Sequence, residues 1–302
     1  MRAVIFPGQG SEFSGMGSSY YEHNLAFQQV ITRADAALDF DLLAYLFGME
    51  PLTAHPERLQ AALLSYQLAL FAALRAEIGT VHYMAGLSLG EYGALVAAGA
   101  CTLENGLALL SVRGAAMADA CAQNDGGMLA VLTADETLLT DVLRLPDLWV
   151  ANRNSPGQTV LAGSRASVKQ AAGLLRQAGV RSVRLRVAGA FHTPFMQPAQ
   201  PALATALADT QFATPQLPVL STTTQTLFTA QNVKQNLLAQ VAAPTNFQAA
   251  IRALAQAGVT EFYELGERPV LGKMLQQTLP DAVTFYAPTP VQAQEEANGT
   301  EG

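Results

Sequence analysis

A five-residue stretch with the pattern Gly-x-Ser-x-Gly constrains the fold of this chain more than any other feature. It runs from Gly86 to Gly90 and places Ser88 at its centre. The apolar run 81–85 before it favours a strand, and segment 91–100 after it is typical of a helix. Strand, sharp turn and helix form the context of a nucleophile elbow, in which glycines allow the bend and the serine hydroxyl stands clear. The sequence therefore predicts an α/β fold that presents Ser88 as a nucleophile, provided that a base lies nearby.

The order of predicted elements changes after the breaker at 124–127. Strands and helices then alternate as strand, helix, strand, strand, helix, strand, over 128–133, 135–145, 148–153, 158–162, 165–177 and 180–187. This βαββαβ order is typical of a ferredoxin-like unit. We therefore predict a small domain over 127–188, inserted into a larger α/β domain built from 1–126 and 189–291. The polar tail 292–302 is predicted to be disordered.

Composition favours a well-packed cytoplasmic protein. Half of the 302 residues are apolar and 14% are charged, which indicates a large buried core. Two cysteines, Cys101 and Cys121, are too few for a disulfide framework or a zinc site. The N-terminal apolar run is too short for a signal peptide, and no long apolar run predicts a membrane span.

Charge is unevenly distributed along this acidic chain, whose net charge is −7. Segment 148–208 contains no Asp or Glu, yet it holds seven of the 17 basic residues: Arg153, Arg165, Lys169, Arg176, Arg181, Arg184 and Arg186. The segment is either a solvated surface or a docking face for an anionic partner. Nucleic acid is not the expected partner, because aromatic residues are not interleaved with the basic ones and the pI is near 5.

The best candidate for a base acting on Ser88 is His192. It lies in a loop where the chain returns from the inserted domain, and domain junctions commonly form sites. Of the other histidines, His23 and His55 lie near polar turns, and His82 begins the strand at its far end from Ser88. No Asp or Glu follows a clear strand of the main sheet between Ser88 and His192, so the third member of the catalytic group is expected to be a backbone carbonyl.

Two further residues stand out. Arg113 is the only charged residue between Glu104 and Asp119 of an apolar helical run. Such a buried cation needs a partner, which is either an internal acid or the carboxylate of a substrate. The loop after the first strand carries Gln9 between two glycines, without the spacing of a nucleotide-binding loop, and it could bring Gln9 toward Ser88.

Six motifs, in order and at family-like spacing from about residue 3 to 279, closely resemble those of the malonyl-CoA:acyl carrier protein transacylases. They are Pro7-Gly8-Gln9-Gly10-Ser11, Gly86-Leu87-Ser88-Leu89-Gly90-Glu91-Tyr92, Arg113-Gly114-Ala115-Ala116-Met117, Asn154-Ser155-Pro156-Gly157-Gln158, Phe191-His192 and Gln240-Val241-Ala242-Ala243-Pro244. The resemblance implies an α/β-hydrolase-like core with a parallel sheet and an inserted ferredoxin-like small domain. It also implies transfer of malonyl from malonyl-CoA to acyl carrier protein for fatty-acid synthesis, with no metal and no cofactor beyond the thioester substrate.

The resemblance also implies a role for each site residue. Ser88 would be the nucleophile and His192 the base, oriented by the main-chain carbonyl of Gln240. The oxyanion hole would comprise Gln9 and the amide of Leu89, Arg113 would hold the malonyl carboxylate, and Phe191 would disfavour branched acyl groups. The carrier protein is acidic as a family, so we expect it to dock near four basic residues: Lys169, Arg176, Arg181 and Arg184. No nucleic acid or membrane is an expected partner.

Three positions depart from the family pattern. Leu87 replaces a usual His, Glu12 stands where Gln is common, and Glu267-Arg268-Pro269 replaces a Gly-Pro-Gly turn that we expect to lie far from the chemistry. Three other functions stay open at this stage. They are a serine esterase or thioesterase, which would need a triad acid, a non-catalytic carrier-binding module, and a freestanding acyltransferase of a polyketide assembly line.

Overall fold

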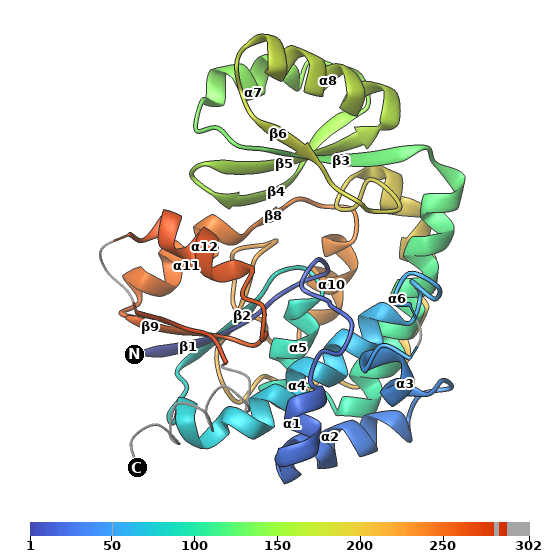
Figure 1. Ribbon diagram of the computed structural model, residues 1–302, viewed down its shortest axis with the longest axis vertical. Coiled ribbons are helices and arrows are strands. Elements are labelled where there is room, and N and C mark those ends of the chain that lie inside the picture. Colours follow the sequence, from blue (N-terminus) through green and yellow to red (C-terminus); the bar gives the residue numbers. More distant parts are fainter. Residues whose placement is uncertain (50, 281–283, 289–302) are drawn as a thin grey trace.

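The computed structural model describes residues 1–49, 51–280 and 284–288, and within them the chain forms two sheets with helices packed around them (Figure 1). The first sheet has five parallel strands in the order β10-β9-β1-β2-β7. Their bounds are β1 Arg2–Phe6, β2 Tyr83–Gly86, β7 Val219–Ser221, β9 Glu261–Glu264 and β10 Thr284–Tyr286. The carboxyl ends of parallel strands meet at one edge, so the loops after β1, β2, β7 and β9 gather there.

Strand β1 shows how this sheet is buried on both faces. Val4 and Phe6 belong to the core on one face, and Ala3 and Ile5 belong to the core on the other, all with no exposed surface. Such a continuous apolar strand is typical of a parallel sheet covered by helices on both sides. The helices on the first face are α2 Leu25–Asp35, α4 Leu59–Ile78, α5 Gly90–Ala97, α6 Leu103–Gln123 and α9 Gln200–Asp209, and those on the second are α11 Phe247–Gln256 and α12 Leu271–Thr278.

The remaining helices are short and complete the large domain. They are α1 Ser18–His23, α3 Leu42–Leu46, α10 Val233–Gln240 and the 3₁₀ helix η1 Pro194–Ala199. Helix α4 is the only described helix that is long and apolar enough to cross a membrane. Of its most apolar 18-residue stretch, 67% is buried inside the protein, as is common for a core helix. The cytoplasmic location stays a prediction.

The second sheet forms the small domain at the top of Figure 1, which α6 reaches from below. Its elements follow the predicted βαββαβ order: β3 Gly126–Val131, α7 Glu136–Val142, β4 Leu148–Ser155, β5 Gln158–Ser164, α8 Arg165–Gln177 and β6 Ser182–Arg184. The spatial order β6-β3-β5-β4 with antiparallel pairing is that of a ferredoxin-like unit, so the predicted fold class is confirmed.

The structure differs from the sequence prediction at the ends of this sheet. The last strand was expected over 180–187, but β6 ends at Arg184. Val183 within the strand, and Leu185 and Val187 after it, are each more than a third exposed. A fifth strand, β8 Thr245–Asn246, joins β4 in parallel although it lies outside segment 127–188. The boundaries at 126 and 188 stay a prediction, and the tail 292–302 lies outside the described residues.

Candidate active site

Ser88 lies in the sharp turn between β2 and α5. Its φ of 56° is in the left-handed region, a conformation that non-glycine residues adopt mainly under local constraint. Two glycines make the turn sterically feasible. A Cβ on Gly86 would lie 1.9 Å from the carbonyl carbon of Gly90, and one on Gly90 would lie 2.0 Å from the Phe6 oxygen. The turn is therefore a nucleophile elbow held against β1.

The Ser88 hydroxyl lies between His192 and Arg113. Its Oγ is 2.9 Å from His192 Nε2, and Arg113 donates to the same oxygen from 3.0 Å. His192 Nδ1 lies 2.9 Å from the main-chain oxygen of Gln240. A carbonyl can only accept, so Nδ1 carries the proton and Nε2 offers its lone pair to the Ser88 hydroxyl.

His192 is 5% exposed, and its φ of 60° is also in the left-handed region. Burial, followed by the nearby positive charge of Arg113, lowers its pKa to about 4, against a partial opposing effect of its hydrogen bonds to backbone. The imidazole is therefore neutral at neutral pH, which is the form that a general base requires.

Arg113 lies on α6 with 1% of its surface exposed. It donates to Gln60 Oε1 at 2.7 Å and to Gln240 Oε1 at 3.1 Å, and its guanidinium lies over the Tyr92 ring. No carboxylate among the described residues forms an ion pair with it, so the internal ion pair that the sequence left open is not found. Burial lowers the pKa of Arg113, and the nearby Tyr92 and Glu91 partly oppose that shift. The site thus holds a cation beside the nucleophile that a small carboxylate could pair with.

The two predicted oxyanion donors, the Leu89 amide and the Gln9 side chain, come from the elbow and from the loop after β1. Leu89 is buried at the N-terminus of α5, where the first N–H groups have no partner within the helix. Gln9 lies in the loop after β1, and its Oε1 accepts from Gln60 Nε2 at 3.3 Å. A Cβ on Gly8 would lie 2.7 Å from the Leu87 oxygen, so this loop packs directly against the elbow.

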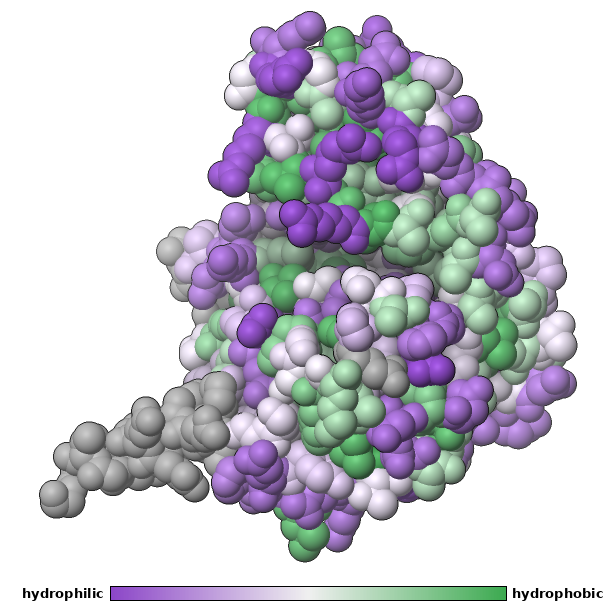
Figure 2. Space-filling model, turned by 45° about the vertical axis from the view of Figure 1, so that its right-hand side comes forward, coloured by the Kyte–Doolittle hydropathy of each residue, from purple (hydrophilic) through white to green (hydrophobic). Residues whose placement is uncertain are grey.

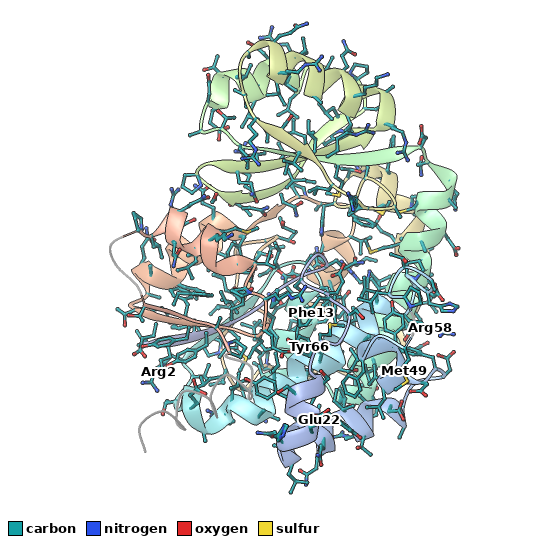
Figure 3. All side chains as sticks on the ribbon, in the orientation of Figure 1. Arg2, Phe13, Glu22, Met49, Arg58 and Tyr66 are labelled. Carbon is teal, nitrogen blue, oxygen red and sulfur yellow. The ribbon has the colours of Figure 1, made fainter. Side chains whose placement is uncertain are left out.

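The turn 267–269 anchors the same loop. Glu267 accepts from Gly17 N at 2.7 Å and from the Tyr66 hydroxyl at 2.9 Å, and the Arg268 guanidinium lies 4.0 Å from the centre of the Phe13 ring. Figure 3 shows Phe13, which belongs to this loop, near Tyr66 of α4. The departure from Gly-Pro-Gly therefore supplies side chains that fix the segment carrying Gln9.

The other predicted residues divide into those near the site and those away from it. Phe191 is half-buried and packs between the core of the large domain and the underside of the small sheet. His82 Nδ1 accepts from the Arg2 amide at 3.2 Å, at the opposite end of the strand from Ser88. Within the described part of the chain, no group of three His, Cys, Asp or Glu residues could hold a metal ion.

The sequence missed two side chains of the site, Gln60 and Glu91. Gln60 lies on α4 and joins Gln9 to Arg113. Glu91 lies on the first turn of α5 and accepts from Gln240 Nε2. Two sequence signals were present: a polar residue, Gln60, in a mainly apolar segment, and an acid, Glu91, directly after the elbow.

Comparison with known proteins agrees with this geometry. The acyl transferase domain family matches residues 4–297. The chain is 35% identical over 286 residues to the polyketide biosynthesis protein ThaF of Burkholderia thailandensis, covering 93% of this chain but only 24% of that protein. It is 34% identical over 284 residues to the malonyl CoA-acyl carrier protein transacylase of Bacillus subtilis, covering 91% and 89% of the two chains.

Among solved structures, a malonyl-transacylase in complex with a type II polyketide synthase acyl-carrier protein superposes with a TM-score of 0.89. The two are 28% identical, and the superposition covers 99% of each chain.

Proposed function

The chain belongs to the acyl transferase family, and we propose that it transfers the malonyl group from malonyl-CoA to the phosphopantetheine thiol of an acyl carrier protein. The observation that carries this proposal is a buried Arg113 that forms no ion pair with any described carboxylate and lies 3.0 Å from the hydroxyl of Ser88. An acyl group that ends in a carboxylate would place its ester at Ser88 and its anion at Arg113. The names of the relatives, which are malonyl transacylases, support the same substrate.

The first half-reaction forms a malonyl-serine ester. His192 Nε2 takes the Ser88 proton as Oγ attacks the thioester carbon, and the negative charge develops on the thioester oxygen. We assign the stabilisation of that oxygen to the Leu89 amide and Gln9, at about 3 kcal/mol for each donor. The tetrahedral intermediate then collapses, the C–S bond breaks, and the CoA sulfur leaves with the proton from His192.

The second half-reaction reverses the roles. His192 takes the proton of the carrier-protein thiol, the thiolate attacks the malonyl-serine carbon, and the Ser88 oxygen leaves with the proton from His192. The Gln240 carbonyl keeps the imidazole in one tautomer throughout. This chemistry needs no metal or redox cofactor, and Phe191 beside His192 is assigned the exclusion of branched acyl groups.

The test is to mix the protein with malonyl-CoA and a holo-acyl carrier protein and to measure the intact mass of the carrier. We expect the carrier to gain one malonyl group. A serine thioesterase would instead release free malonate and leave the carrier unmodified. The absence of both products would leave only a carrier-binding role.

We assign the activity to fatty-acid synthesis, because relatives from Bacillus subtilis, Haemophilus influenzae and Salmonella typhimurium are malonyl CoA-acyl carrier protein transacylases that this chain matches over about nine tenths of their length. The similarity to ThaF and to the partner of a polyketide carrier favours a polyketide assembly line as the second candidate. Comparing kcat/KM for the two kinds of carrier protein separates them: a preference of tenfold or more for the polyketide carrier, about 1.4 kcal/mol, would overturn the assignment.

The basic residues of segment 148–208, which contains no Asp or Glu, form an exposed surface on the small domain. Two of its cations are neutralised, since Arg153 pairs with Glu136 and Arg165 with Asp125. The other basic residues, none in an ion pair with a described residue, are Lys169, Arg176, Arg181, Arg184 and Arg186. Arg184 lies opposite Leu129 in the sheet, on the face that α8 covers, so it shares a side with Lys169 and Arg176 of that helix.

An apolar strip borders this surface. Val183 lies opposite Ala130, on the face of the sheet away from α8. The Leu185 amide donates to the Met128 oxygen. Met128 and Ala130 belong to the apolar core on that face, so Val183 and Leu185 extend this apolar surface toward solvent. Figure 2 shows a hollow between the small domain and the large domain, with hydrophobic surface along its rim. We propose that an acidic carrier protein contacts the basic residues while its pantetheine arm enters this hollow toward Ser88.

Charge reversal on this surface is expected to impair the carrier step alone. Changing Lys169, Arg176, Arg181 and Arg184 to Glu should raise KM for the carrier protein roughly tenfold and flatten its salt dependence, because exposed charges steer association. Acylation of Ser88 by malonyl-CoA should stay unchanged. The control for each single reversal is Arg33→Glu, which makes the same charge change per residue on α2 of the large domain. An unaltered carrier KM in the quadruple variant would show that the surface is only solvated.

The pH dependence of Ser88 acylation should follow His192. A base works only when neutral, and a pKa lowered to about 4 keeps His192 neutral as pH falls from 8 to about 5. Single-turnover acylation should therefore be flat over that range and decline below it. His192→Ala should slow both half-reactions by roughly 10²–10⁴-fold. An acid limb near the ordinary histidine value of 6.5, or loss of only one half-reaction, would contradict the assignment.

A further inference from the structure

Glu91 is a fully buried acid, three residues after the nucleophile, that takes no part in the chemistry proposed above. One carboxylate oxygen accepts from the Ser221 hydroxyl at 3.0 Å, from the Thr222 amide at 2.5 Å and from the Thr222 hydroxyl at 3.0 Å. The other accepts from the side-chain amide of Gln240. Burial raises the pKa of this carboxyl group, and the four donors act against that rise because they stabilise the ionised form.

Gln240 carries the influence of Glu91 into the site. Its Nε2 donates both to Glu91 and to the Ser88 carbonyl at 3.0 Å, and its Oε1 accepts from Arg113 at 3.1 Å. Its main-chain oxygen accepts from His192 Nδ1 at 2.9 Å. One fully buried residue therefore contacts the nucleophile, the base and the substrate-binding cation.

The orientation of the Gln240 amide is fixed by what its neighbours can do. Arg113 can only donate, and the Ser88 carbonyl and an ionised Glu91 can only accept. Each neighbour therefore demands the orientation that is found, and Glu91 is the neighbour whose chemistry can be changed without altering the reacting groups.

We propose that Glu91 is a positioning residue for malonyl transfer. Its carboxylate holds the Gln240 side-chain amide so that Oε1 faces Arg113 and the main-chain carbonyl of Gln240 faces His192. The proposal rests on the proposed function. The negative charge of Glu91 also favours the protonated form of Arg113 against the effect of burial, which supports the same arrangement.

Glu91→Gln should disturb this arrangement without removing volume. The first carboxylate position accepts from the Thr222 amide, which cannot turn into an acceptor, so the new NH₂ group must occupy the second position and face Gln240 Nε2. Two donors then oppose each other. If the Gln240 amide turns over to relieve this, it presents its NH₂ to Arg113 and its oxygen to the Ser88 carbonyl.

The matched control is Glu264→Gln. Glu264 is also a buried glutamate, 1% exposed, but it accepts only from the backbone amides of Val270, Leu271 and Gly272 at the start of α12. Both substitutions remove a buried negative charge and should lower the melting temperature. Only Glu91→Gln should lower kcat, by roughly ten- to a hundredfold, and reduce the preference for malonyl-CoA over acetyl-CoA. Equal transfer rates in the two variants would overturn the proposal.

A double-mutant cycle with Gln240→Ala tests whether Glu91 acts through Gln240. We expect Glu91→Gln to have almost no further effect on kcat in the Gln240→Ala background, because coupled residues are non-additive. The same loss in both backgrounds would show that Glu91 only supports the fold. If Glu91→Gln does not fold, Glu91→Asp replaces it, since the shorter carboxylate keeps the charge and withdraws from Gln240. Failure of the wild-type protein to malonylate a carrier would instead overturn the proposed function.

Discussion

Ser88→Ala is expected to abolish covalent malonylation and to reduce transfer to the carrier protein by on the order of 10⁴-fold or more, as in other enzymes that lose a serine nucleophile. The reason is that, in the part of the chain that the structure describes, Ser88 carries the only hydroxyl bonded to His192 Nε2. Ser88 Oγ is the atom that both His192 Nε2 and Arg113 reach, at 2.9 and 3.0 Å. The alanine variant keeps the φ-positive turn but has no atom that can form the acyl ester.

The measurement is the intact mass of the protein after mixing with malonyl-CoA, before any carrier is added. The wild-type protein should gain one malonyl group, and peptide mapping should place it on Ser88. Ser65→Ala is the matched control, because it removes a buried hydroxyl that donates only to the Ala61 oxygen within α4. The same adduct in Ser88→Ala as in wild type would refute the nucleophile assignment.

Much of the large-scale fold was predictable because it depends on local patterns. The elbow followed from an apolar run, two glycines and a helical segment, and the structure places Ser88 in the expected turn between β2 and α5. The ferredoxin-like order followed from the alternation of strand-like and helix-like hydrophobic patterns between residues 128 and 187. The strands that the sequence did not predict, β7, β8 and β10, have three, two and three residues. Such short strands carry too little alternation to be recognised and exist because their neighbours pair with them.

The site was predictable only where chain order or family resemblance identified a residue. His192 followed by elimination, and Gln240 followed from the resemblance alone, since nothing in its own sequence context marks a main-chain carbonyl as a histidine partner. Gln60 was missed because its role depends on α4 packing beside α6, which brings it within 2.7 Å of Arg113 across 53 positions of sequence. Glu91 was missed as an active-site residue because its partner Gln240 lies 149 positions away.

Arg113→Ala is expected to invert the acyl preference of the enzyme. Removing one partner of a buried, hydrogen-bonded charge pair costs about 2–5 kcal/mol, so kcat/KM for malonyl-CoA should fall by roughly 10²-fold or more. Acetyl-CoA has no carboxylate, and its transfer should hold or rise because the site no longer leaves a buried cation without an anion. The measurement is single-turnover acylation of Ser88 by each thioester.

Two further variants separate binding of the carboxylate from support of the fold. Arg113→Met fills much of the same space without charge, so it should show the same inversion as Arg113→Ala with less loss of stability. Arg113→Lys keeps a charge but not the planar fork that now spans Gln60, Gln240 and Ser88, and it should recover malonyl transfer only in part. An equal fall for malonyl and acetyl groups in all three variants would mean that Arg113 only holds Gln60 and Gln240 in place. In that case the selection of a carboxylated acyl group would have to come from another part of the site.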